Sequence, residues 1–189
     1  TGQAEATVVF AASERDDPGC AGVDDFSISF DPSSVSVASE ETEPVVVSTT
    51  VPNGQDADTF CWDITATVQN DPSQNASDTE EISLEVPELH TCEASLSKTN
   101  IRVDPGKQGQ VQVTFENTGN AEWDLNVART GPKANWVSVD GASSGLLPYD
   151  TSSDERSFTL NIEPDDSLDA DSVSTVVVQG RDGGTVACE

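Results

Sequence analysis

The chain has 189 residues and a formal net charge of −27, from 35 acidic residues against 8 lysines and arginines. Phosphate contacts need clustered lysine and arginine, so this balance disfavours nucleic acid as a partner, and the same argument excludes anionic membrane surfaces. Hydrophobic residues make up 34% of the chain. They alternate with polar residues in several segments, which argues against an intrinsically disordered acidic chain.

Apolar alternation with period two, bounded by Pro, Gly, Asn and Asp, predicts short β-strands, and no segment has convincing helical periodicity. In the first half we expect strands at 4–11, 26–30, 34–38, 44–51, 60–69 and 81–86. In the second half we expect them at 93–97, 101–103, 110–116, 122–128, 136–139, 156–162, 172–179 and 185–188. About seven short strands per half are typical of a β-sandwich. The sequence therefore predicts an all-β protein of two tandem immunoglobulin-like β-sandwich domains.

The predicted domain boundary lies near the proline at position 87, between an N-terminal sandwich of residues 1–88 and a C-terminal sandwich of residues 89–189. An internal repeat supports this division. A shift of 66 residues aligns the valines at positions 35, 37, 45 and 47 with valine or isoleucine at 101, 103, 111 and 113. Each half also has a tryptophan within a predicted strand, Trp62 and Trp123.

A family resemblance rests on the run that starts at Ser95 and passes through Trp123, SLSKTNIRVDPGKQGQVQVTFENTGNAEWDL. It contains an apolar pair, a Pro-Gly turn, a valine-rich strand and an Asn-Thr-Gly turn. This pattern resembles the opening strands of immunoglobulin-like modules of the CARDB type, a cell-adhesion-related family of archaeal and bacterial surface proteins. The resemblance implies a surface location and a sandwich architecture, and it does not imply a ligand.

The charge pattern itself indicates a habitat. Acidic residues occur in every segment, whereas the only lysines are Lys98, Lys107 and Lys133. Repulsion between so many carboxylates falls away only when salt shortens the screening length to about 3 Å near 1 M. The composition therefore indicates adaptation to molar salt, and it resembles that of proteins from halophilic archaea.

The four cysteines are Cys20, Cys61, Cys92 and Cys188. They contain no close pair, and with a single histidine they do not form the pattern of a zinc site. Four cysteines allow three pairings, of which the domain layout favours Cys20 with Cys61 and Cys92 with Cys188. Because disulfides form in oxidising compartments, the sequence predicts an extracellular protein.

Three further features agree with export. The chain has no methionine, so we expect that Thr1 is not a translation start and that a leader has been removed. The sequon Asn75-Ala76-Ser77 lies in a polar stretch, which makes Asn75 a candidate glycosylation site. No apolar run approaches the roughly 20 residues that cross a bilayer, so we expect no membrane span.

The sequence contains few residues in patterns typical of a catalytic site. His90, the only histidine, lies in the predicted linker, where we expect a solvated spacer that nothing nearby orients. The cysteines are assigned to disulfides, and no GxSxG, HExxH or glycine-rich phosphate loop occurs, so we predict a protein that is not an enzyme. We expect Trp62 and Trp123 in the core rather than on a sugar-stacking platform, and the position of Trp136 is left open.

Four aspartates close together form a candidate cation site: Asp165, Asp166, Asp169 and Asp171. The pairs Asp16-Asp17 and Asp24-Asp25 around Cys20 leave the same two interpretations open. Calcium prefers such oxygen ligands, but the segment lacks the glycine and the terminal glutamate of an EF-hand. With 35 acids in the chain, clusters of this kind are expected without a bound ion. We therefore favour a solvated acidic loop and no cofactor, with calcium as the alternative.

The first predicted strand has an unusual surface. Ala4, Ala6, Val8, Phe10 and Ala12 fall on one face, and Glu5 is the only ionic residue among the first twelve. We therefore hypothesise that residues 4–12 pair with a sheet edge in a neighbouring subunit, as in strand donation. The alternative is an ordinary first strand of the same sandwich.

These features favour a structural subunit of an extracellular surface assembly, such as a pilus-like filament built from copies of the chain. The alternative is an adhesion module or a surface-layer component that recognises a glycan or a protein, for which the surroundings of Trp136 and Tyr149 are the candidate patch. Because each copy is strongly acidic, assembly should depend steeply on salt.

Overall fold

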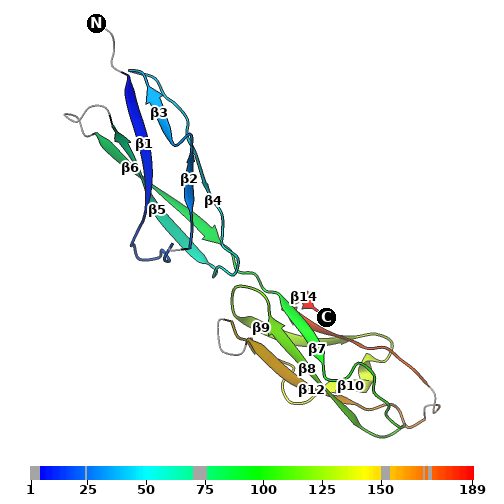
Figure 1. The fold of residues 1–189 in the computed structure, drawn as a ribbon. Coiled ribbons are helices and arrows are strands. Elements are labelled where there is room, and N and C mark those ends of the chain that lie inside the picture. Colours follow the sequence, from blue (N-terminus) through cyan, green and yellow to red (C-terminus); the bar gives the residue numbers. More distant parts are fainter. Residues whose placement is uncertain (1–4, 24, 70–75, 150–153, 168, 170–171) are drawn as a thin grey trace. The chain divides into compact units, whose positions relative to one another are not determined.

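Alternating apolar and polar residues form β-strands along both halves of the chain. The structure is a computed structural model that describes residues 5–23, 25–69, 76–149, 154–167, 169 and 172–189. Within these residues the protein is all-β, with 14 strands and one short 3₁₀-helix (Figure 1). Contacts divide the chain into two units, Thr1–Pro87 and Glu88–Glu189. Each unit contains two sheets, which is consistent with two β-sandwich domains.

The C-terminal unit has two antiparallel four-stranded sheets, with strand orders β10-β12-β8-β7 and β11-β9-β13-β14. Its elements are β7 (Cys92–Leu96), β8 (Gly109–Asn117), β9 (Trp123–Thr130), the 3₁₀-helix η1 (Ala134–Trp136), β10 (Val137–Val139), β11 (Ser144–Leu147), β12 (Glu155–Ile162), β13 (Val177–Asp182) and β14 (Thr185–Cys188). The strand β8 shows why a sheet forms here, because every second residue from Val111 to Phe115 is buried while the residues between them are not.

The two inner faces of this unit form a core of ten buried residues. The rings of Phe115 on β8 and Phe158 on β12 meet edge to face at 6.0 Å. Trp123 and Leu125 on β9 are buried core residues of the opposite sheet. Burial of one large apolar side chain contributes roughly 1.5–3 kcal/mol, so a core of this size can hold the unit together.

A tight turn between β8 and β9 depends on Asn117 and Gly119. The buried Asn117 side chain donates from Nδ2 to the carbonyls of Ala121 and Pro148, at 2.9 and 3.1 Å. Its Oδ1 accepts a hydrogen bond from Gly119 N at 2.9 Å. A Cβ on Gly119 would lie 1.8 Å from the carbonyl oxygen of Leu89, so only glycine fits at this position.

The N-terminal unit has a four-stranded sheet of order β3-β1-β5-β6 and a sheet of only two strands, β2-β4. Its strands are β1 (Ala6–Glu14), β2 (Ile28–Asp31), β3 (Ser34–Val37), β4 (Val46–Thr49), β5 (Asp58–Val68) and β6 (Ser77–Val86). The core cluster has four buried residues, Val23, Phe60, Trp62 and Val86. Phe26 packs against two of them, with ring centroids 4.6 Å from Phe60 and 5.4 Å from Trp62.

The two units share one strand order. In the C-terminal unit β9 lies between β11 and β13, β14 follows β13, and β10 pairs with β12. In the N-terminal unit β1 lies between β3 and β5, β6 follows β5, and β2 pairs with β4. The six strands β1 to β6 therefore correspond in order to β9 to β14. Among the described residues, the N-terminal unit has no counterpart of β7 and β8.

The predicted strand at 101–103 is wrong, because this segment pairs with no other strand. Asp104-Pro105-Gly106 follows it at once, and Lys107 N donates to Asp104 O at 3.0 Å in a turn. The side chains of Ile101 and Val103 lie within 3 Å of where a Cβ on Gly109 would be, although Ile101 is 37% exposed. Apolar alternation thus occurs here without sheet pairing.

Two other expectations differ from the structure in the second half. The strand β11 was not predicted, because its segment, Ser144-Gly145-Leu146-Leu147, begins with residues typical of turns. The strand β13 begins at Val177 rather than at 172. The shift of 66 residues is also wrong as a structural repeat, since it aligns β4 with β8 whereas the strand order equates β4 with β12.

Candidate assembly surface

The proposed assembly strand is an inner strand of its own unit. β1 pairs with β3 on one side, where Ala6 faces Val37, and with β5 on the other, where Ala12 faces Ile64. Val8 has a partner on both sides, and the ring of Phe10 stacks on that of Phe30 at 5.7 Å. Ala4 lies outside the described residues. This is the arrangement of an ordinary first strand, so donation of β1 to another copy would require exchange of these pairs.

The edge that is covered in the C-terminal unit and open in the N-terminal unit lies instead at β4. In the C-terminal unit β12 pairs with β10 on one side and with β8 on the other. Its counterpart β4 pairs only with β2, through four residue pairs from Ile28–Thr49 to Asp31–Val46. Among the described residues, no strand takes the position that β8 has beside β12. The main-chain N–H and C=O groups along this edge therefore have no ladder partner.

Burial confirms that this side of the unit is incomplete. Val47 faces Phe30, which packs on β1, so Val47 belongs to the inner face of the sheet, yet it is 40% exposed. On β12 the inward residues Phe158 and Leu160 are only 6% and 2% exposed. The difference arises because Phe158 and Leu160 are covered by their neighbours on β8, Val113 and Val111. Nothing described covers the inner side of β4 in the same way.

The same edge carries no charge. Residues 44–55, PVVVSTTVPNGQ, form the longest run without a charged side chain in the sequence. Val46, on the outer face, is 61% exposed, and Val51 is also exposed. Exposed strand edges in natural proteins are usually protected by charges, prolines or bulges within the strand. β4 has none of these, although Pro44 and Pro52 lie on either side of it.

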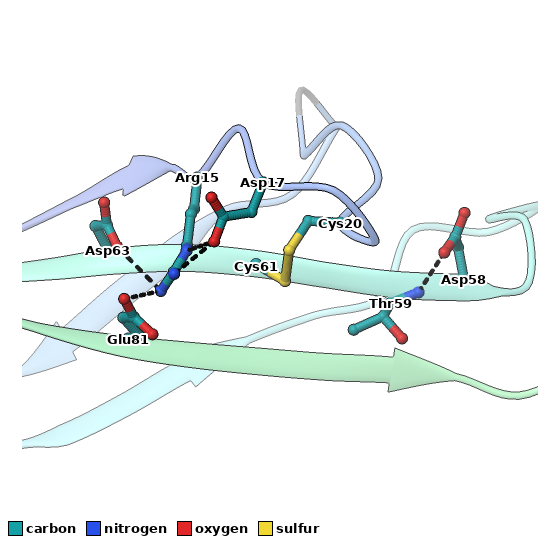
Figure 2. Close-up of a disulfide and its surroundings, with 8 residues drawn as sticks. All are labelled: Arg15, Asp17, Cys20, Asp58, Thr59, Cys61, Asp63 and Glu81. Atoms are coloured by element: carbon teal, nitrogen blue, oxygen red, sulfur yellow. Dashed lines mark hydrogen bonds and ion pairs between the residues drawn. A yellow bond between two sulfur atoms is a disulfide. The ribbon is translucent and has the colours of Figure 1, made fainter.

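One disulfide closes the end of the N-terminal unit, between Cys20 and Cys61 of β5 (Figure 2). The segment that carries Cys20 runs along β5, with Ala21 N donating to Thr59 O at 2.8 Å. Val23 and Phe26 from this segment then cover the buried rings on β5. The disulfide-linked segment thus covers one end of the core in a unit that has only two strands in its second sheet.

A cluster of opposite charges lies beside this disulfide (Figure 2). The Arg15 guanidinium contacts Glu81, lies 2.5 Å from Asp17 Oδ2 and is 3.9 Å from Asp63 Oδ1. Such partly exposed pairs contribute about 0–1 kcal/mol each. With three carboxylates already around it, this one cation is satisfied within the unit.

The second disulfide joins Cys92 at the start of β7 to Cys188 at the end of β14. These are edge strands of the two sheets, so the bond ties the faces of the C-terminal sandwich together. Gly180 lies against it, because a Cβ there would be 2.9 Å from Cys188 Sγ and 3.0 Å from Cys92 Sγ. No free cysteine is left in the chain.

The expectation that nothing orients His90 is wrong. Its ring stacks on the indole of Trp123 at 5.7 Å, and Nδ1 lies 2.9 Å from Asp182 Oδ2. Nε2 is 3.2 Å from Glu88 Oε2 but makes no hydrogen bond with it. Trp123 is on β9 and Asp182 ends β13, and these two strands are neighbours in one sheet. The contacts of His90 therefore hold the first residues of the C-terminal unit against that sheet.

Trp62 and Trp123 are both buried in the cores of their units, as predicted. Trp136 is half-buried, its indole nitrogen donates to Asp165 Oδ2 at 3.1 Å, and the ammonium of Lys133 lies 4.6 Å from its ring. One face of this ring is therefore occupied by a neighbouring side chain.

The structure describes Asp165, Asp166 and Asp169 of the acidic loop. Asp165 is used by the Trp136 indole, and Asp166 lies beside Gly106. Asp171 lies outside the described residues. Across the part of the chain that the structure describes, no cluster of three or more metal-binding side chains is found.

Two other expectations concern the surface of the chain. Asn75 lies outside the described residues, and Ser77, the third residue of its sequon, begins β6. No described helix has the length and apolarity needed to cross a bilayer. Comparison with known proteins finds no family that matches the chain and no curated protein that matches its sequence.

Proposed function

We propose that this chain is a structural, non-catalytic module of an extracellular surface assembly that works in high salt. The observation that carries the proposal is the incomplete second sheet of the N-terminal unit, which has an uncharged edge and an inward valine left 40% exposed. A sandwich in this state gains apolar burial and main-chain hydrogen bonds when another strand pairs with it. Assembly is therefore the activity that best fits the geometry.

The rest of the chain supports the proposal. Two disulfides agree with an oxidising, extracellular location. The charge of −27 agrees with a halophilic source, because in dilute salt such copies repel one another. The resemblance of the run from Ser95 to surface-protein modules points the same way, and under this proposal the chain is a component of a filament or a surface layer.

A glycan- or protein-binding module is the second candidate, and it is less well supported. Stacking on a sugar needs an exposed aromatic face. Lys133 covers one face of the half-buried Trp136, and Tyr149 is half-buried as well. Within the described residues, the aromatic rings of the candidate patch are therefore only partly exposed, whereas the edge of β4 is open.

The proposal is tested by negative-stain electron microscopy of the purified chain in about 2 M salt and again after dialysis to about 0.1 M, where the screening length rises from a few ångströms to roughly 10 Å. We expect ordered assemblies in high salt and their loss on desalting. Labelling of native cells with an antibody should place the chain at the cell surface. A chain that stays monomeric in both salts and is found inside cells would refute the proposal.

A further inference from the structure

The open edge of β4 has the chemistry of a specific docking site for one more strand. β4 corresponds to β12, and β12 accepts β8 as an antiparallel neighbour over eight residue pairs. The same geometry beside β4 would continue the two-stranded sheet and cover Val47. A strand docked in this way would run antiparallel to β4, and apolar side chains on its inward face would cover Val47.

The charge pattern indicates where such a strand comes from. Two copies of a chain with a charge of −27 repel over most of their surfaces. Residues 44–55 are the longest stretch where one copy can lie against another without bringing carboxylates together. This stretch contains β4 itself, and an antiparallel pairing of β4 with β4 is compatible with two-fold symmetry.

We propose that β4 of a second copy of this chain pairs antiparallel with β4, with Val47 opposite Val47 of that copy, to form a continuous sheet of order β2-β4-β4-β2. In this register residues with odd numbers face residues with odd numbers, so inward side chains stay inward in both copies. Glu43 then faces Val51 of the second copy, and no acid faces an acid along the paired strands. This inference rests on the proposed function, because it names the partner at the edge that supports assembly.

The pairing predicts a direct cross-link. Opposite residues of an antiparallel pair have Cα atoms about 4.5–5.5 Å apart, which lies within the range of about 4.4–6.8 Å that a disulfide spans. The variant Val47→Cys should therefore form a covalent dimer under mild oxidation in about 2 M salt, seen on a non-reducing gel. The matched control is Ser36→Cys, an exposed position on β3, which is likewise an edge strand of the N-terminal unit. We expect cross-linking of most of the first variant and little of the second.

A second variant tests the same contact without a new thiol. Val47→Lys places two like charges opposite each other at the centre of the pairing. Light scattering at about 50 µM protein, a concentration suited to a small interface, should therefore give a monomer in place of the β4–β4 dimer and of any larger assembly built from it. The control Val186→Lys changes an exposed valine on β14, an edge strand of the other unit, and should leave the dimer intact. Circular dichroism of each variant checks that the chain still folds.

The outcomes separate this inference from the proposed function. If Val47→Cys cross-links no more than Ser36→Cys, or only to a different protein, the second-copy pairing is wrong. Assemblies that survive Val47→Lys unchanged would also overturn the pairing, while leaving the proposed function in place. Dimers that cross-link through Val47→Cys, from a chain that forms no larger assembly and is absent from the cell surface, would support the pairing and refute the function.

Discussion

Valine to alanine should lower the free energy of unfolding much more in the closed core of the C-terminal unit than at the open edge of the N-terminal unit. Val113 on β8 is 1% exposed and faces Phe158, whereas Val47 on β4 is 40% exposed. Valine to alanine removes two methyl groups, each worth about 0.8 kcal/mol of transfer free energy when fully buried. For Val113→Ala this gives about 1.6 kcal/mol, to which the cavity left in a closed core adds roughly 1 kcal/mol.

For Val47→Ala the cost should be smaller. Because 40% of the side chain is already in water, the transfer loss falls to about 1 kcal/mol, and a site open to solvent leaves no closed cavity. Calorimetry in about 2 M salt, at a concentration low enough for monomers, should show a separate transition for each unit. Each kcal/mol shifts the melting temperature of a domain of this size by about 4–8 °C.

We therefore expect Val113→Ala to lower one transition by more than 10 °C, at about 4–8 °C per kcal/mol, and Val47→Ala to lower the other by about half as much or less. Each variant should leave the transition of the other unit unchanged, which serves as the internal control. Equal shifts for the two variants would show that Val47 is as well covered as Val113. In that case the reasoning from an incomplete sheet would be refuted.

Replacement of both cysteines of a disulfide by serine should lower the free energy of unfolding of that unit, by about 4 kcal/mol for Cys20–Cys61 and nearly 5 kcal/mol for Cys92–Cys188. The difference arises because the closed loops span 41 and 96 residues. Denaturant titration measures both losses, and a larger loss from the shorter loop would contradict the loop-entropy account. Gly119→Ala should lower the melting temperature of the C-terminal unit by more than 10 °C at about 4–8 °C per kcal/mol, since its Cβ would lie 1.8 Å from Leu89 O, whereas Gly184→Ala, where no atom lies within 4 Å, should change it little.

The fold class was accessible from the sequence because sheet formation leaves a local signal. Alternation in segments such as Val111 to Phe115 reports both the strand and its buried face, so the all-β class and most strands were predicted. The same signal failed at Ile101 and Val103, which are apolar but pair with no strand, and Ile101 is exposed. Alternation is a local property, whereas pairing depends on residues far away in the chain.

Alternation could not predict the open edge for the same reason. Whether β4 is an edge strand depends on the absence of a neighbour, which alternation does not record. Attention fell on residues 4–12 because they are apolar and nearly uncharged, yet the structure uses β1 as an inner strand between β3 and β5. One signal was present in the sequence, since residues 44–55 are a longer uncharged run than the first strand.

In a protein with 35 acids among 189 residues, the position of an uncharged segment is itself informative. The inward face of an inner strand such as β8 lacks charge because its environment is apolar, and Phe115 on that face is fully buried, whereas the outward Glu116 is exposed. β4 also lacks charge, yet Val46 on its outer face is 61% exposed, so burial within the unit does not account for its composition. A carboxylate there would improve solubility at no cost in packing, and the neighbouring residues Glu40, Glu41 and Glu43 show that acids are tolerated just outside the strand. The absence of charge on an exposed edge is accounted for when that edge meets another acidic copy, because a single facing pair of carboxylates would oppose the contact.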